Sequence, residues 1–494
     1  MQLWNLLQTS RRDFGPRAAV RTRRGDVSFA AMFQAAEVLS REIEAVGLPS
    51  GLPLALAFPN GPAFLTAVLA LFRLESPAAL VSPRYSASEL VTVAEGGGVA
   101  AFLTLRSDAT RIQEMLGTCR TVSLAAQTWG EDLVFVIPAG FETASVPVLA
   151  DGAAVLKLTS GSTGTLKGIA LGPEQVEAEA RNVIETLGLG VDDRILASIP
   201  LFHSYGFDLG VLATLFSGAC LVLQDFFVPR RICDDLAHEE VTVFLGVPTM
   251  YRRMLEEPSG PSVPAPRLRY LLSCTAPLEA ETIHAFHARF GLPLCQHYGS
   301  SETGAVTNHD PAAVLRHPDS IGRPIRNVQV RIVDEHGTEV ALGAEGEVVV
   351  TSAAVARGYF LGAPVDGGPF REGSFWTGDL AVRDGDGFIQ LRGRKDHVIN
   401  VGGLKVSPEE VRRTLESHPS VREAAVIGVQ DAAGEAAVSA MVTLKQPATE
   451  KELIVFCYRA LADYKVPRRI HIRDALPRGP AGKVRLRPED VPLA

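Results

Sequence analysis

The chain has 494 residues, too many for one hydrophobic core, so we expect two or more domains. Hydrophobic residues make up 46% and charged residues 21%, as in soluble globular proteins, and the formal net charge of -8 argues against nucleic acid or an anionic membrane as the main partner. Six scattered cysteines form no C-x-x-C pair, which disfavours a zinc site or a redox dithiol. The first residues, MQLWNLLQTSRRDFG, lack a long apolar run and a cleavage site, which predicts a cytoplasmic protein.

As far as about Gly322, apolar strand-like runs alternate with helical periodicity. Examples are the strand-like segments 52–58, 78–82 and 220–224 and the helical segment 62–74. This alternation predicts parallel α/β layers. The most apolar stretch, residues 52–72, is broken by PNGP, which predicts a strand, a turn and a helix with Pro62 in its first turn, and no membrane insertion.

After Gly322 the pattern changes. Residues 328–352 and 379–394 alternate in polarity and contain glycine turns, which indicates antiparallel hairpins. The last hundred residues then read as a small α+β unit, and the charged segment Arg394–His397 predicts a boundary. The expected fold is therefore α/β, with a large multi-layer N-terminal domain (1–395) that includes a β-barrel-like subdomain, and a small α+β C-terminal domain (396–494).

The segment TSGSTGTLKG (159–168) contains five hydroxyls, three glycines and one lysine but no acidic residue. Strand-like flanks predict a hairpin tip. Because Leu166 precedes Lys167, the segment fails the Walker pattern, and it also fails G-x-G-x-x-G. Glycines let backbone N–H groups approach an anion, and the hydroxyls and Lys167 add donors and charge. These features favour polyphosphate binding over the alternative of a flexible linker.

The segment QHYGSSETGAV (296–306) offers another set of ligand-binding groups. It resembles a nucleophile elbow but has Thr303 in place of the second glycine. Tyr298 can stack on a base, Ser301 can reach a phosphate, and Glu302 can hold Mg²⁺. A structural turn explains this segment, taken alone, equally well.

Three later loops carry further polar candidates. In FWTGDLA (375–381), Asp379 at the end of a short strand can accept hydrogen bonds from a ribose diol, or it is a turn residue. Residues 391–411 contain the pair Gly402-Gly403 and a helix start at Ser407 with Glu410 in the capping-box position. Lys483 lies in the Pro/Gly-rich tail 476–488, where a solvated surface charge is the alternative.

Together, the order and content of these loops resemble the adenylate-forming superfamily, which comprises acyl-CoA synthetases, nonribosomal-peptide adenylation domains and firefly-type luciferases. The resemblance covers nearly the whole chain, because PLFHSYGF (200–207), IGRPIRNVQVRIVD (321–334), GEVVV (346–350) and ARGYF (356–360) also match in order. It implies an AMP-forming acid–thiol ligase that uses ATP, Mg²⁺ and coenzyme A. A carboxylate first attacks the α-phosphate of ATP, which gives an acyl-adenylate and pyrophosphate. A thiol then attacks the acyl carbon, and AMP leaves.

The resemblance also implies roles for individual residues. Catalytic roles fall to Lys483, Glu302, Ser301 and His203, with Glu302 as the metal ligand and Asp396 as the hinge between two domain positions. The remaining implied residues bind nucleotide or CoA: Thr159, Ser160, Gly161, Ser162, Thr163, Gly164, Lys167, Thr275, Ala276, Pro277, Tyr298, Gly299, Asp379, Arg394, Gly402 and Gly403. The implied acyl pocket is formed by His203, Phe207, Val247, Met250, Ser273, Cys274, Thr275 and His297.

Departures from the family pattern bear on the two substrates. Ser301 replaces the usual threonine but keeps its hydroxyl. No extra segment separates Glu347 from Trp376, where ligases that load carrier proteins have an insertion, and this favours CoA as the acceptor. His297 and Cys274-Thr275 stand where smaller residues are common, so we expect a shortened tunnel and a short or aromatic acid.

Three other functions share part of this sequence pattern. A stand-alone adenylation enzyme that loads a carrier protein would share the first half-reaction. A catalytically inactive nucleotide-binding protein is disfavoured by the presence of Lys167, Glu302, Asp379 and Lys483. An oxygenase of the luciferase type would require a special substrate.

Overall fold

The computed structural model describes residues 2–49, 51–139, 152–160, 166–224, 226–238, 240–257, 265–361, 368–395, 399–401, 404–430, 436–461, 463–478 and 484–491. The chain divides into a large unit (Met1–Val330 and Val350–Phe375) and a small unit (Arg331–Val349 and Trp376–Ala494). Residues 331–349 and 376–395 thus group with the C-terminal residues, whereas the sequence suggests a boundary after residue 395. Asp396, the predicted hinge, lies outside the described residues. Within the described part, no helix is both long and apolar enough to span a bilayer.

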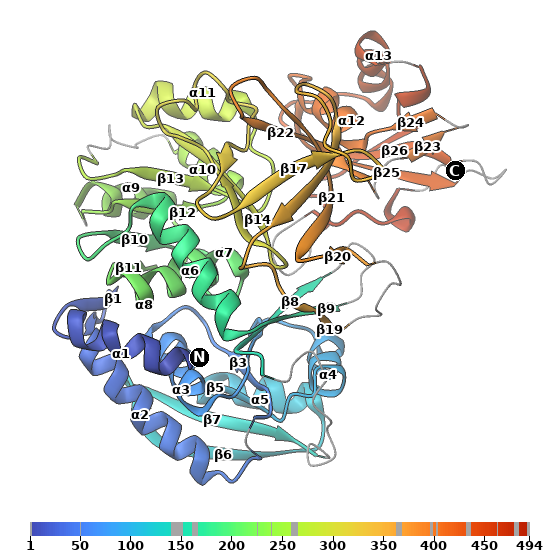
Figure 1. Ribbon diagram of the computed structural model, residues 1–494. Helices are drawn as coiled ribbons and strands as arrows, with labels where there is room; N and C mark the ends of the chain where they lie inside the picture. Colours follow the sequence, from blue (N-terminus) through green and yellow to red (C-terminus); the bar gives the residue numbers. More distant parts are fainter. Residues whose placement is uncertain are drawn as a thin grey trace. The chain divides into compact units, whose positions relative to one another are not determined.

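The first sheet of the large unit has nine strands in the order β16-β15-β14-β13-β12-β10-β11-β1-β2. Its parallel strands β14, β13, β12, β10, β11 and β1 are labelled in Figure 1. The pairs from β1 through β11, β10, β12 and β13 to β14 are parallel, and the outer pairs are antiparallel. The strands are β1 Ala18–Thr22, β2 Gly25–Ser28, β10 Arg194–Ala197, β11 Cys220–Leu223, β12 Val243–Gly246, β13 Tyr270–Ser273, β14 Leu294–Ser300, β15 Gly304–Asn308 and β16 Arg323–Pro324.

The second sheet of the large unit has eight strands in the order β19-β9-β8-β4-β3-β5-β7-β6. Its centre is parallel, from β5 through β3 and β4 to β8, so the predicted parallel α/β layers are confirmed in both sheets. The strands are β3 Leu54–Ala57, β4 Ala78–Leu80, β5 Ala101–Leu105, β6 Cys119–Thr128, β7 Glu131–Pro138, β8 Val155–Ser160, β9 Leu166–Leu171 and β19 Gly358–Leu361.

The helices of the large unit cover these sheets, and α3 (Pro62–Leu74) is buried over most of its length. It begins with Pro62 in its first turn, as predicted, and every residue from Ala63 to Phe72 is buried. It contacts α1, α2 and strands β3, β4 and β6, which explains its apolar sequence. The other helices are α1 Leu3–Phe14, α2 Phe29–Ala45, α4 Ala87–Gly96, α5 Arg106–Leu116, α6 Pro173–Leu187, α7 Ser204–Gly206, the π-helix η3 Phe207–Leu212, α8 Ala213–Ser217, α9 Pro229–His238, α10 Pro248–Glu256 and α11 Ala280–Phe290.

A five-stranded sheet has the order β17-β18-β21-β20, with β22 paired to β21. The boundary between the units passes through β17, β18 and β21. Among the described strands, the first and last strands of this order do not pair with each other. The expected barrel-like subdomain is therefore an open sheet. The strands are β17 Gln329–Val333, β18 Gly346–Thr351, β20 Phe370–Arg371, β21 Ser374–Arg383 and β22 Ile389–Arg394.

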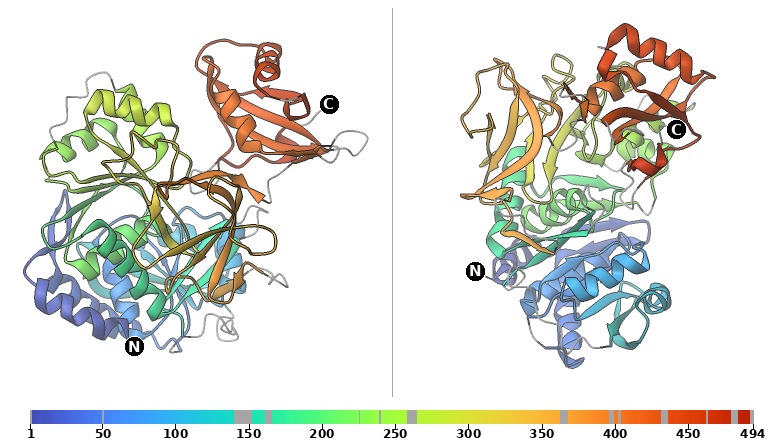
Figure 2. Two further views of the ribbon diagram at one scale, coloured as in Figure 1. Left: turned by 45° about the horizontal axis from the view of Figure 1, so that its top comes forward. Right: turned by 90° about the vertical axis from the view of Figure 1, so that its right-hand side faces the viewer.

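The C-terminal part of the small unit is α+β, as predicted. Its core contains Val411 and Leu415 of α12, Val438 of β26, and Leu453 and Cys457 of α13. Figure 2 shows these helices beside the three-stranded sheet β25-β26-β27. The elements are β23 Ile399–Val401, β24 Leu404–Val406, α12 Pro408–Glu416, β25 Val421–Gln430, β26 Ala436–Leu444, α13 Glu450–Ala460, η5 Asp463–Lys465, β27 Arg469–Ile472 and η6 Pro488–Asp490.

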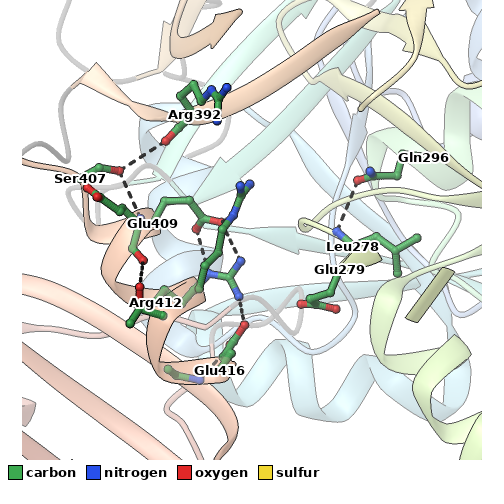
Figure 3. Close-up of polar contacts among 12 residues, drawn as sticks. Leu278, Glu279, Gln296, Arg392, Ser407, Glu409, Arg412 and Glu416 are labelled. Atoms are coloured by element: carbon green, nitrogen blue, oxygen red, sulfur yellow. Dashed lines mark hydrogen bonds and ion pairs between the residues drawn. The ribbon is translucent and has the colours of Figure 1, made fainter. Parts of the chain in front are cut away.

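The start of α12 differs in one detail from the predicted capping box. Ser407 Oγ accepts the backbone N–H of Glu410 at 3.4 Å and donates to the carbonyl of Arg392 at 3.3 Å (Figure 3). The carboxylate of Glu410 instead accepts two hydrogen bonds from Lys465 Nζ, both of 2.7 Å. An ammonium is a stronger hydrogen-bond partner for a carboxylate than a backbone N–H. The Ser407 half of the capping box therefore forms, whereas the Glu410 side chain binds Lys465.

Candidate functional site

The predicted phosphate loop lies at the tip of a hairpin, as the sequence indicates. Strands β8 and β9 pair antiparallel from Val155↔Leu171 to Ser160↔Leu166, and Thr159 pairs with Lys167. Residues 161–165, and with them Gly161 to Gly164, lie outside the described residues, as does the side chain of Ser160. A Cβ on Gly168 would come within 2.4 Å of the Phe360 ring, so a larger residue here would have to displace that ring from the hairpin.

Tyr359 connects Lys167 with Glu302. Its hydroxyl donates a hydrogen bond of 2.8 Å to Glu302 Oε1, and Lys167 Nζ lies 5.0 Å from the centroid of its ring. The backbone carbonyl of Glu302 also accepts the N–H of Ala356 at 2.8 Å. The structure therefore brings Lys167 and Glu302 to one place through β19, the strand of the ARGYF segment. Tyr359 was not among the residues proposed from sequence.

The turn between β14 and β15 carries Ser301 and Glu302. Ser301 Oγ lies 2.6 Å from Ser204 Oγ, which places the segment PLFHSYGF beside this turn. Gly299 is required here, because a Cβ would approach the carbonyl oxygen of Gly304 to 2.3 Å. Tyr298 and Gly299 belong to β14, with Gly299 opposite Ala305. His203 precedes the short helix α7, and its carbonyl accepts the N–H of Phe207 at 2.9 Å.

His297 is buried and electrically neutral. Its ring stacks on Tyr205 at 5.9 Å between centroids, and its Nδ1 lies 3.3 Å from Asn308 Oδ1. Burial lowers the pKa of His297 to about 4, and the contact with Asn308 opposes this shift only partly. Because Asn308 Nδ2 donates to the carbonyl of His309 at 3.1 Å, its Oδ1 is the atom that faces His297, which assigns the proton to Nδ1.

The other predicted acyl-pocket residues come from separate elements. Phe207 lies on the π-helix in edge contact with Phe64. Val247 caps α10, and Met250 Sδ accepts a hydrogen bond from Ser198 Oγ at 3.8 Å. Ser273, at the end of β13, has a buried Oγ without a hydrogen-bond partner among the described residues. Cys274 is also buried.

The segment Thr275-Ala276-Pro277 follows β13 as a loop, and Thr275 has an unusual backbone. Its φ is +76°, a left-handed conformation that disfavours β-branched residues. Ala276 and Pro277 are exposed. Thr275 itself is partly buried.

In the small unit, Asp379 and Arg394 face each other across β21 and β22. They pair in register, and Arg394 Nη1 lies 3.1 Å from Asp379 Oδ1. Asp379 lies inside the long strand β21 rather than at the end of a short strand, and its N–H donates to Thr377 Oγ1 at 3.0 Å. Glu347, which was not predicted, accepts from the Gly378 N–H at 3.2 Å and from Lys395 Nζ at 3.0 Å. Gly402, Gly403 and Lys483 lie outside the described residues.

The donor groups fit magnesium only together with a nucleotide. Within the described ranges, no cluster of three or more His, Cys, Asp or Glu side chains is arranged to hold a metal ion. Glu302 provides one carboxylate, oriented by Tyr359. Magnesium in ATP-dependent enzymes is bound by one or two carboxylates together with substrate phosphates and water, and a single carboxylate beside Lys167 agrees with this arrangement.

Comparison with known proteins covers both units. The AMP-binding enzyme family matches residues 7–360, and the AMP-binding enzyme C-terminal domain matches residues 410–483. The chain is 32% identical over 473 residues to a sulfoacetate–CoA ligase of Cupriavidus necator (93% of this chain, 91% of that protein). It is 31% identical over 449 residues to a feruloyl-CoA synthase of Amycolatopsis sp (90% of each). A solved structure of o-succinylbenzoate coenzyme A synthetase from Bacillus subtilis with ATP and magnesium superposes with a TM-score of 0.80 at 26% identity (97% of this chain, 98% of that one).

Proposed function

The chain belongs to the family of AMP-binding enzymes as an AMP-forming ligase that joins a carboxylic acid to coenzyme A, and we propose that this acid is short or aromatic. Its substrates are ATP and CoA, and its metal is Mg²⁺. The observation that carries the acid class is His297. A buried, neutral ring stacked on Tyr205 occupies a position in β14 directly before Tyr298. This bulk supports a short tunnel, and relatives that act on sulfoacetate or form feruloyl-CoA agree with it.

We assign the ATP-binding roles to the groups described above. Lys167 would hold the terminal phosphates, and Glu302, fixed by the hydrogen bond from Tyr359, would bind magnesium. Magnesium bound there would offset phosphate charge. Ser301, joined to Ser204, would contact a phosphate. Tyr298 would pack on adenine and the Thr275–Pro277 loop would border it, while Asp379, held by Arg394, would accept the ribose hydroxyls.

The chemistry requires activation because a carboxylate is a poor electrophile. Joining it to AMP makes a mixed anhydride with a good leaving group. Negative charge accumulates where the carboxylate meets the α-phosphate, and Lys483 would stabilise it. We further propose a domain 1–395 and a mobile domain 396–494 that turns about Asp396 between the half-reactions, with Gly402-Gly403 lining the CoA channel. A cytoplasmic location is proposed, since ATP and CoA are available there.

A series of acids from acetate to palmitate, together with benzoate and cinnamate, tests the acid class. Pyrophosphate release is measured with ATP, Mg²⁺ and CoA present. We expect kcat/KM to be highest for a short or aromatic acid. Each methylene that does not fit within the tunnel should lower kcat/KM by roughly tenfold or more. His297→Gly is the matched variant and should shift the optimum toward longer acids. Highest activity of the unaltered enzyme on acids of twelve or more carbons would refute the assignment.

A further inference from the structure

Three buried ionisable side chains from different elements lie close enough inside the large unit to influence one another's charge. Lys157 lies on β8, Asp208 on the π-helix η3, and Glu179 on α6. All three are almost fully buried, with 2% to 3% of their surface exposed. Lys157 Nζ contacts both carboxylate oxygens of Asp208 at 2.7 Å, which forms a complete ion pair. None of the three is needed for the proposed chemistry.

Glu179 contacts the turn that carries Glu302. Its Oε1 accepts the backbone N–H of Ala305 at 2.9 Å. Its Oε2 is buried without a hydrogen-bond partner among the described residues. A Cβ on Gly304 would come within 1.9 Å of that oxygen, so the carboxyl group packs directly on the Gly304 backbone.

The charges of this cluster do not balance if both acids are ionised. Lys157 is already paired with Asp208, so an ionised Glu179 would leave one uncompensated negative charge away from water. The pKa of Glu179 is raised to about 8, mainly by burial and next by the charge of Asp208, while Lys157 and the Ala305 N–H act in the opposite direction. Burial also raises the pKa of Asp208, but the ammonium in contact with both of its oxygens favours its ionised form.

We propose that Glu179 is a positioning residue that acts as a neutral carboxylic acid, holding the Ser301–Ala305 turn so that Glu302 keeps its place beside Tyr359 and Lys167. The catalytic consequence rests on the proposed role of Glu302, whereas the protonation does not. A neutral acid keeps the hydrogen bond from Ala305 without adding charge. The Lys157–Asp208 pair separately joins β8, a strand of the phosphate hairpin, to the π-helix.

Urea unfolding of the full-length chain tests the protonation independently of any activity. A carboxyl whose pKa rises from 4.5 in the unfolded chain to about 8 in the folded one stabilises the fold at low pH, and this contribution is lost as the pH rises through that window. Glu179→Gln has no such group. We therefore compare the unfolding constants of the two proteins as the pH rises. Between pH 4.5 and 8, the unfolding constant of the unaltered protein should increase relative to that of the variant by up to tenfold per pH unit. A difference that stays constant with pH would overturn the proposal.

Acid-dependent pyrophosphate exchange tests the positioning. Glu179→Gln keeps an acceptor for the Ala305 N–H, so KM for ATP at pH 7 should change less than about threefold. In the unaltered enzyme, loss of the Glu179 proton should raise KM for ATP above pH 8. The Gln variant should show no such rise in KM. Glu179→Leu removes the acceptor and should raise KM for ATP by about tenfold, with a smaller effect on kcat. Glu185→Gln, on the exposed face of α6, is the control and should behave like the unaltered enzyme.

Equal damage from Glu179→Gln and Glu179→Leu would contradict a neutral acid in this place. If no acid supported exchange by the unaltered enzyme, the proposed function would fail, and the urea series would still decide the protonation of Glu179. The two failures are therefore distinguishable.

Discussion

Replacement of Lys483 by alanine is expected to slow acid-dependent pyrophosphate exchange by ~10²–10³-fold. The side chain is assigned to the charge that builds up as the carboxylate attacks the α-phosphate, so its loss should lower kcat more than it raises KM for ATP. Thioester formation from a pre-formed acyl-adenylate does not involve that charge and should change less than about threefold. Exchange and thioester formation are each measured with purified protein.

A matched control for this variant is Lys451→Ala, which removes an exposed lysine from the first turn of α13 in the same part of the chain. It should leave both half-reactions unchanged. Pyrophosphate exchange by Lys483→Ala at the rate of the unaltered enzyme would show that the lysine of the C-terminal tail is a solvated surface charge.

Lys157→Met is expected to destabilise the folded chain by about 3–5 kcal/mol, because it leaves the carboxylate of Asp208 buried without its partner. The measurement is urea unfolding of the full-length protein at pH 7. The double variant Lys157→Met/Asp208→Leu removes both charges and should recover most of the loss. Equal destabilisation of the single and double variants would contradict this explanation.

Lys167→Met is the control for that experiment, since Lys167 lies on the partner strand of the same hairpin and is only half-buried. It should change the free energy of unfolding by less than about 1 kcal/mol, because a partly exposed charge is solvated in both states. Its expected effect is on KM for ATP.

The sequence correctly predicted those helices and hairpins whose formation depends mainly on residues close together in the chain. The helix 62–74 followed from its proline and its apolar run, and the β8–β9 hairpin followed from strand-like residues on both sides of a glycine-rich segment. The capping box failed at Glu410 because Lys465, 55 residues away, provides a better partner. Such a competition cannot be seen in a local pattern.

The site residues that the sequence missed depend on contacts between distant segments. Tyr359 is 57 residues from Glu302, and the sequence places it only in a short strand. Lys157 within the apolar run VLKL was a signal, because a charge in a buried strand requires a partner. Glu179 gave no such signal, since α6 has several other acidic residues, and only the fold shows that this one faces inward.

The central claim is that the enzyme converts an acid to its CoA thioester and releases AMP. It is tested most directly by incubating the purified protein with ATP, Mg²⁺, CoA and its preferred short or aromatic acid, and quantifying nucleotides and thioester by chromatography. We predict equal amounts of AMP and acyl-CoA, with formation of both dependent on the acid. Release of ADP, or an acyl-adenylate that CoA leaves intact and that only a phosphopantetheine-bearing carrier protein consumes, would contradict this account.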